Sequence, residues 1–178
     1  MSNWARVAED RRVLERIIFA FYTVEPGIRT VLFVGCESYT ADYERRHFPS
    51  HEYWTLDPDE SHRRFGGKRH VVARLEELGR HFGPGSLDLI ICNGVYGWGL
   101  NRLADCEAAL SQCHLCLARD GHLLLGWNDV PKWNPAPITA IENLRLFREY
   151  EFPPLGSTRY LTNTSYRHTY NFYRKAAS

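Results

Sequence analysis

Residues 30–40, TVLFVGCESYT, constrain the fold of this chain more than any other stretch. Residues 31–34 form an unbroken apolar run, which predicts a strand buried on both faces of a parallel sheet. Gly35 permits a tight turn, and a short helix after it would gather backbone N–H groups at the strand's carboxyl end. Because open α/β sheets bind ligands at this edge, the stretch predicts a ligand site beside Gly35.

An acidic pair lies about one strand–helix unit downstream of this turn. Asp57 and Asp59 occur in the segment YWTLDPD, and Asp57 is the twenty-second residue after Gly35. In dinucleotide-binding folds, an acid about twenty residues past the glycine turn binds the ribose hydroxyls. The spacing therefore predicts that Asp57 faces a nucleoside.

Length and charge favour one domain, residues 1–178, that acts on neither nucleic acid nor membrane. A chain of 178 residues can bury a substantial core, and its formal net charge is +1 with both signs scattered. No basic block predicts a polyanionic partner. The apolar run 17–21 is too short to span a bilayer and follows several acids, so neither a signal peptide nor a membrane span is predicted.

The cysteines predict a reduced, cytoplasmic setting rather than a disulfide framework or a metal site. There are five, an odd number, mostly within predicted strands and helices. Cys106 and Cys113 share a helical stripe with neighbouring leucines, where thiols behave as small apolar side chains. Zinc needs about four converging ligands, which the spacing around Cys116 does not supply, so no metal is expected.

Strand and helix patterns alternate along the chain. Helices are predicted over about 4–22, packed on the core within residues 1–25, and over 39–47, 75–82, 101–118 and 138–150; strands are predicted over 30–34, 53–56, 70–73, 87–92, 122–127, 159–162 and 169–174. This order predicts an α/β fold, a Rossmann-like three-layer sandwich. Its seven-stranded sheet would be mostly parallel, with an antiparallel strand from the C-terminal hairpin.

Three segments resemble the class I S-adenosylmethionine-dependent methyltransferases, including the type 11-like group. VLFVGCESYT resembles their first motif, VLDVGCGTG, although Phe33 replaces the usual acid and residues 37–39 replace the second and third glycines. LDPD resembles the acid after their second strand, and residues 88–126 resemble their fourth strand, the next helix and the turn of type LKPGG. The resemblance covers roughly residues 30–125, and the C-terminal hairpin agrees with it.

The resemblance implies S-adenosylmethionine as the cofactor and assigns its contacts. The implied cofactor residues are Gly35, Cys36, Ser38 and Tyr39 near the methionyl part, Asp57 and Pro58 at the ribose, Arg74 and Leu75 at the adenine, and Asn93 and Gly94 beneath the sulfonium. We also expect Glu37 to pair with the cofactor ammonium, supplying the charge that Phe33 lacks. The alternative is that Glu37 is a solvated loop acid.

The implied reaction is an in-line displacement, which mainly needs alignment and exclusion of water and does not require a catalytic triad. Tyr39, Tyr96, Trp98, Trp127 and Asn128 are candidate contacts to a small-molecule acceptor with an oxygen or nitrogen atom, and their aromatic faces suit an aromatic or heteroaromatic ring. For Trp98 and Trp127, core packing is the alternative.

Asp129 is the candidate general base. Its alternative role is to stabilise the loop before Pro131, because Asn-Asp before proline is common in turns. Two other functions compete with methyl transfer: another nucleotide-binding enzyme on the same sheet, and a catalytically silent module that binds the cofactor.

Overall fold

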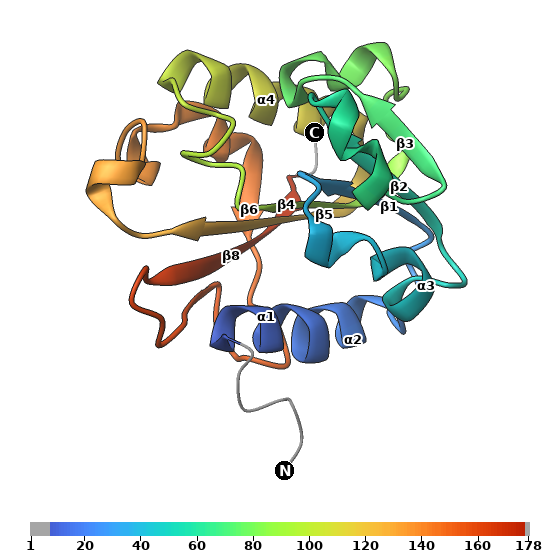
Figure 1. Cartoon of the computed structure of the whole chain (residues 1–178). Coiled ribbons are helices and arrows are strands. Elements are labelled where there is room, and N and C mark those ends of the chain that lie inside the picture. The colour runs from blue at the N-terminus through green and yellow to red at the C-terminus, as the bar shows by residue number, and fades with distance from the viewer. Residues whose placement is uncertain (1–7, 177–178) are drawn as a thin grey trace.

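The computed structural model describes residues 8–176 and shows an eight-stranded sheet between two helical layers (Figure 1). The strands are β1 Thr30–Val34, β2 Glu52–Asp57, β3 Arg69–Val72, β4 Leu87–Asn93, β5 Leu117–Asn128, β6 Phe147–Glu149, β7 Arg159–Leu161 and β8 His168–Lys175. Their order is β3-β2-β1-β4-β5-β8-β6, and β7 also pairs with β8. Strands β1 to β5 pair in parallel, and β8 is antiparallel to β5, β6 and β7. The predicted fold class is confirmed.

The helices are short, and much of the connecting chain forms 3₁₀ turns. One continuous helix consists of α1 Glu9–Val13, a π-helical turn Leu14–Ile18 and α2 Phe19–Tyr22; α3 is Tyr43–His47, and α4 is Leu103–Cys116. The 3₁₀ turns are Ser38–Thr40, Glu60–Phe65, Leu75–Arg80, Pro131–Trp133, Ile138–Ala140 and Glu142–Leu146. The helix predicted over 75–82 is thus a 3₁₀ segment, and the first residues of the helix predicted over 4–22 lie outside the described residues. No helix between residues 8 and 176 is both long and apolar enough to cross a bilayer.

The sheet separates two apolar cores. Val31 and Phe33 face the layer of α1, α2 and α3, whereas Leu32 and Val34 face the layer of α4. Phe33 is 1% exposed, and its ring lies edge-on to Tyr43 at a centroid distance of 5.5 Å. Phe33, which stands where the class I methyltransferases usually have an acid, is therefore part of the core and contributes no polar group to a site.

The helix predicted over 138–150 is wrong. Two 3₁₀ turns occupy residues 138–146, and β6 then pairs with the end of β8, which raises the strand count from seven to eight. β6 and β7 cover consecutive stretches of the outer edge of β8. Since an unpaired edge exposes backbone N–H and C=O groups, pairing along β8 outweighs the helical pattern of this segment.

His122 on β5 is a buried histidine that affects stability rather than the site. It is 3% exposed, its Nδ1 lies 3.3 Å from the Tyr22 hydroxyl, and its ring packs edge-on against Tyr150. Burial, reinforced by the Arg174 guanidinium and opposed by Asp120, lowers the pKa of His122 to about 3. The imidazole is therefore neutral in the folded protein at pH 7.

We expect His122 to make the protein less stable in mild acid. The unfolded histidine binds a proton near pH 6.5 whereas the folded one does not, so this contribution is complete above pH 6.5 and is lost as the pH falls. Between pH 7 and pH 5 the loss amounts to about 2 kcal/mol. Urea unfolding at both pH values measures it: wild type should lose about 2 kcal/mol more than His122→Gln, and equal losses would contradict the assignment.

Candidate functional site

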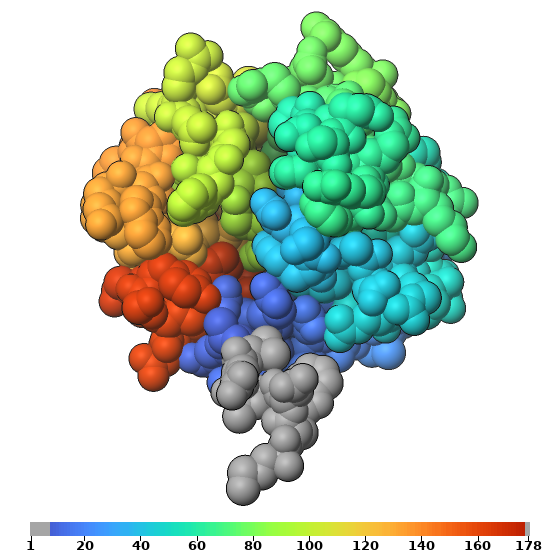
Figure 2. Space-filling view, viewed as in Figure 1, coloured from blue at the N-terminus to red at the C-terminus, as the bar shows by residue number. Residues whose placement is uncertain are grey.

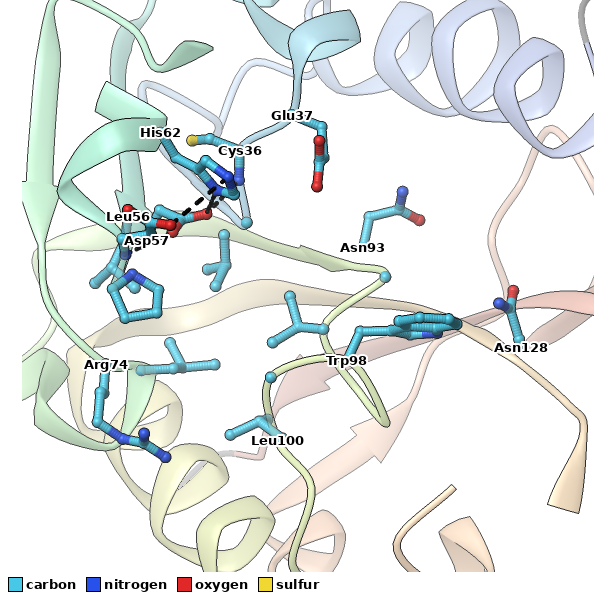
Figure 3. A pocket seen from close by; sticks show the side chains of 18 of the residues that line it. Cys36, Glu37, Leu56, Asp57, His62, Arg74, Asn93, Trp98, Leu100 and Asn128 are labelled. Atoms are coloured by element: carbon cyan, nitrogen blue, oxygen red, sulfur yellow. Dashed lines mark hydrogen bonds and ion pairs between the residues drawn. The ribbon is translucent and has the colours of Figure 1, made fainter. Parts of the chain in front are cut away.

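A pocket of about 600 Å³ opens at the carboxyl ends of the parallel strands (Figure 3). The lining residues lie at or beyond the ends of four strands: Val34, Gly35, Cys36, Glu37 and Tyr39 for β1; Leu56, Asp57, Pro58, Asp59 and His62 for β2; Arg74, Leu75 and Glu76 for β3; and Asn93, Gly94, Val95, Trp98, Gly99 and Leu100 for β4. Asp10, Asn128, Tyr166 and His168 complete the lining. The pocket therefore lies at the edge of the sheet that the glycine turn predicted.

The turn after β1 requires a glycine. Gly35 has a φ of +85°, a conformation that favours glycine, and its N–H donates to the Leu56 carbonyl at 2.9 Å. A Cβ at Gly35 would lie 3.3 Å from the Val95 side chain. The chain thus turns tightly out of β1, and the Val95 side chain packs so closely against Gly35 that a side chain at position 35 would crowd it.

Asp57 joins the ends of β1 and β2. It is 6% exposed, and its carboxylate accepts hydrogen bonds from the N–H of Cys36 and the N–H of Asp59, both at 2.8 Å. The Nδ1 atom of His62 lies 3.2 Å from the same carboxylate. A carboxylate offers about four acceptor positions, so these contacts leave about one for a ligand hydroxyl.

His62 was missed by the sequence analysis, which left the segment SHRRFGGK unassigned. The 3₁₀ turn Glu60–Phe65 places its ring near both acids at the end of β2, with Nδ1 3.2 Å from Asp57 and Nε2 3.9 Å from Asp59. The sequence signal that could have found His62 is its spacing of three residues from Asp59. Asp59 caps the start of the 3₁₀ turn, and one such turn brings residue 62 back to the end of β2.

The residues after Cys36 differ in where they lie. Figure 3 shows the exposed Glu37 side chain entering the pocket on the side of Asn93. Tyr39 is 40% exposed and lines the pocket, and the Arg11 guanidinium lies 4.2 Å from the centre of its ring. Ser38 does not line the pocket.

Cys36 is not a nucleophile in this structure. Burial and the neighbouring Asp57 carboxylate raise the pKa of its thiol to about 12, so it stays protonated. Its contribution to the pocket is the backbone N–H that anchors Asp57.

Arg74 lies at the opposite end of the pocket from Asn128 (Figure 3), and the next residue, Leu75, also lines the pocket. Leu75 is 4% exposed, and the Arg74 guanidinium donates to Glu76 through Nε at 3.0 Å. Arg74 is thus neutralised locally, and Leu75 offers an apolar contact.

Asn93 and Gly94 end β4, as predicted, and both line the pocket. Trp98, in the loop that follows, is 64% exposed and stands at the pocket with its ring directed toward Asn128 in Figure 3. Trp98 is therefore not a core-packing residue, which was the alternative role considered for it.

Besides Ser38, three further predicted residues do not line the pocket. Trp127 is 3% exposed and donates from Nε1 to Asn171 at 2.8 Å, which fits the core-packing alternative. The Tyr96 hydroxyl donates to the Ala136 carbonyl. The Asp129 carboxylate pairs with the guanidinium groups of Arg159 at 2.9 Å and Arg167 at 3.3 Å, contacts that suit its loop-stabilising alternative.

Residues far apart in the sequence complete the pocket wall. The Tyr166 hydroxyl donates to the Asp10 carboxylate at 3.0 Å, and the Tyr170 hydroxyl donates to the Asp10 carbonyl at 2.8 Å. Figure 2 shows the blue N-terminal helix at the surface beside the red C-terminal segment, in agreement with these contacts. Neither Asp10 nor Tyr166 was predicted, because nothing local in the sequence links them.

The pocket carries an excess of acidic side chains. Its lining includes the carboxylates of Asp10, Glu37, Asp57, Asp59 and Glu76, against one guanidinium, that of Arg74. This charge suits a neutral or cationic ligand better than an anionic one. Within residues 8–176, no group of three or more His, Cys, Asp or Glu side chains is arranged to hold a metal ion.

Comparisons with solved structures show the fold. The chain superposes on the N-methyltransferase NodS from Bradyrhizobium japonicum WM9 in complex with S-adenosyl-L-homocysteine, with a TM-score of 0.71, 14% identity and coverage of 98% of this chain and 92% of that one. For a TehB-like SAM-dependent methyltransferase from Corynebacterium glutamicum, the TM-score is 0.64 and the identity 18%, and the match covers 98% of this chain and 97% of that one. For the 1,6-didemethyltoxoflavin-N1-methyltransferase from Burkholderia thailandensis, with 1,6-didemethyltoxoflavin and S-adenosylhomocysteine bound, the TM-score is 0.62 and the identity 15%. The match covers 98% of this chain and 86% of that one.

No family model and no curated protein sequence matches the chain. The likeness to the solved structures, at 14–18% identity, shows that the chain has the class I methyltransferase fold.

Proposed function

We propose that the chain binds S-adenosylmethionine in this pocket and transfers its methyl group to a small-molecule acceptor. One observation carries the proposal: the Asp57 carboxylate is fixed by the N–H of Cys36 beside the left-handed turn at Gly35, within one pocket. A ribose hydroxyl fits the remaining acceptor position of Asp57. The NodS and didemethyltoxoflavin structures, which contain S-adenosylhomocysteine, support the same ligand.

The pocket residues fit the parts of this cofactor. Leu75 and Pro58 would contact the adenine, Asp57 would accept from the ribose, and Gly35 with Gly94 would let the backbone approach the methionyl chain. The acidic lining suits the cationic sulfonium and ammonium groups. Bound S-adenosylmethionine supplies an activated methyl group; the chain's own residues orient the acceptor and exclude water, which can lower a barrier by about 7–11 kcal/mol.

Asn128 and Trp98, which Figure 3 shows away from Arg74, would contact the acceptor together with Asn93 and Tyr39, which line the same pocket. The attacking atom would be oxygen or nitrogen, and the exposed Trp98 suits a flat acceptor. The didemethyltoxoflavin enzyme, whose substrate is a small molecule, supports this class over nucleic acid.

Calorimetric titration of the purified protein with S-adenosylhomocysteine and, separately, with NAD tests the cofactor. Binding of the former alone supports the proposal. Binding of NAD alone would favour a different nucleotide-binding enzyme, and binding of neither would overturn cofactor binding altogether. Turnover of labelled S-adenosylmethionine with a panel of small aromatic acceptors then separates an enzyme from a silent binder.

Glu37→Gln tests the pairing with the cofactor ammonium. Because Glu37 is exposed, we expect the variant to bind S-adenosylhomocysteine only three- to tenfold more weakly. Glu52→Gln is the matched control, because Glu52 begins β2 and lies at the end of that strand away from Asp57 and the pocket. This variant should leave the affinity unchanged. An unchanged affinity in Glu37→Gln would assign Glu37 to the solvated loop instead.

A further inference from the structure

His168 holds the side chains of two asparagines in the pocket wall. It begins β8 and is 4% exposed. Its Nδ1 lies 2.7 Å from the Oδ1 of Asn128, and its Nε2 lies 3.0 Å from the Oδ1 of Asn93. All three residues line the pocket, although they come from three different strand ends.

The two ring nitrogens of a neutral His168 must play different hydrogen-bonding roles, one as donor and one as acceptor. A neutral imidazole has one N–H and one lone pair, so it can donate to only one carboxamide oxygen. Burial lowers the pKa of His168 to about 4, so the ring is neutral at pH 7. The oxygen and nitrogen of an asparagine amide have nearly the same shape and exchange by rotation. One of the two amides therefore turns its NH₂ group to the lone pair of His168.

The groups that face away from the ring are fixed by the same rule. The amide that gives its oxygen to His168 presents its NH₂ to the pocket, and the amide that gives its NH₂ presents its oxygen. We infer that His168 is a positioning residue that makes Asn93 and Asn128 present one donor and one acceptor, so that the site takes an uncharged, planar molecule carrying a donor beside an acceptor. Carboxamides, lactams and amino-heteroaromatic rings have this chemistry. This inference rests on the proposed function and narrows its acceptor.

The packing around the three residues supports a fixed arrangement. A Cβ at Gly126 would lie 2.0 Å from the Oδ1 of Asn93 and 3.0 Å from the Nε2 of His168, so the amide occupies the space that a side chain would fill. The His168 ring packs against Tyr170 at a centroid distance of 4.9 Å, and its backbone N–H donates to the Thr164 hydroxyl at 2.9 Å.

The charges at this end of the pocket exclude an anionic acceptor. The nearby lining groups include the Asp10 carboxylate, which accepts from Tyr166 at 3.0 Å, and the Glu37 carboxylate, which enters the pocket beside Asn93 (Figure 3). Arg74, the guanidinium of the lining, is held by Glu76 at the other end. A carboxylate on the acceptor would therefore face like charges without a counter-ion.

Nuclear magnetic resonance of the imidazole nitrogens tests the arrangement without an acceptor. In ¹⁵N-histidine-labelled protein, the His168 signals, assigned by their loss in His168→Gln, should show one protonated and one unprotonated nitrogen from pH 6 to pH 8. Two protonated nitrogens in that range would overturn the inference, because the ring would then donate to both amides.

Binding of three matched probes to the protein saturated with S-adenosylhomocysteine tests the acceptor class. Benzamide carries a donor and an acceptor, acetophenone carries only the acceptor, and benzoate carries a negative charge. We expect benzamide to bind about five- to tenfold more tightly than acetophenone, which corresponds to about one hydrogen bond, and more tightly still than benzoate. Equal binding of benzamide and acetophenone, tighter binding of benzoate, or no benzamide binding would each overturn the inference.

Two variants separate His168 from the general shape of the site. His168→Phe keeps a ring without nitrogens and should remove the preference for benzamide, whereas His168→Gln, which both donates and accepts, should keep part of it. A preference that survives His168→Phe would overturn the positioning role. Affinity for S-adenosylhomocysteine in the same samples distinguishes the two failures: no binding to wild type rejects the proposed function, and normal binding without the probe preference rejects this inference alone.

Discussion

Replacing Asp57 with alanine is expected to weaken the binding of S-adenosylhomocysteine at least tenfold. The variant lacks the carboxylate that would accept a hydrogen bond from a ribose hydroxyl, and a hydrogen bond to a charged group contributes about 1.5–3 kcal/mol. The same change removes the acceptor of the Cys36 N–H, which holds the turn at Gly35 in place. Calorimetric titration of the variant and wild type measures the effect, and an affinity within twofold of wild type would contradict the role of Asp57.

The same variant should also be less stable. The N–H of the buried Cys36 and the N–H of the exposed Asp59 lose their acceptor, and an unsatisfied buried donor such as that of Cys36 costs about 1–3 kcal/mol in the free energy of unfolding. Asp42→Ala is the matched control because Asp42 is exposed, lies outside the pocket lining and pairs with the exposed Arg45. Urea unfolding should show a loss for Asp57→Ala and a change within about 0.5 kcal/mol for Asp42→Ala.

The end of the pocket beside Gly35 could be predicted because its signals are local in the sequence. A buried strand, a glycine that turns out of it and an acid at the end of the next parallel strand must meet at one sheet edge, whatever the rest of the chain does. Gly35 and Asp57 accordingly lie in one pocket, and Asn93 and Gly94 end β4 as expected.

The other end could not be predicted in the same way. His168 reaches Asn93 across 75 residues, and Tyr166 reaches Asp10 across 156, so these contacts depend on how β8 pairs with β5 and how the first helix packs beside it. A lone histidine in sequence gives no sign of such partners. Trp127 shows the converse: it resembles a site residue by position, but Asn171 on β8 accepts its N–H within the core.

The segment around residue 150 shows why a local pattern can fail. Residues 138–150 have a helical spacing of apolar side chains, yet they form 3₁₀ turns and β6 because the outer edge of β8 is available for pairing. The chain then folds back at Phe152, whose N–H donates to the Ser157 carbonyl at 3.0 Å. Phe147 and Phe152 thereby enter different cores on the two faces of the sheet.

Phe152→Ala is expected to cause the largest loss of stability among these variants, about 3–5 kcal/mol in the free energy of unfolding. Phe152 is fully buried, its ring stacks on Phe172 of β8 at a centroid distance of 4.4 Å, and the edge contact to Phe21 joins it to the first helix. Urea unfolding measures the loss, and Leu161→Ala on β7, where the side chain is 42% exposed, is the control with a small expected change. Equal effects of the two substitutions would mean that residues 147–161 do not pack along β8, and that the C-terminal wall carrying Tyr166 and His168 is placed differently.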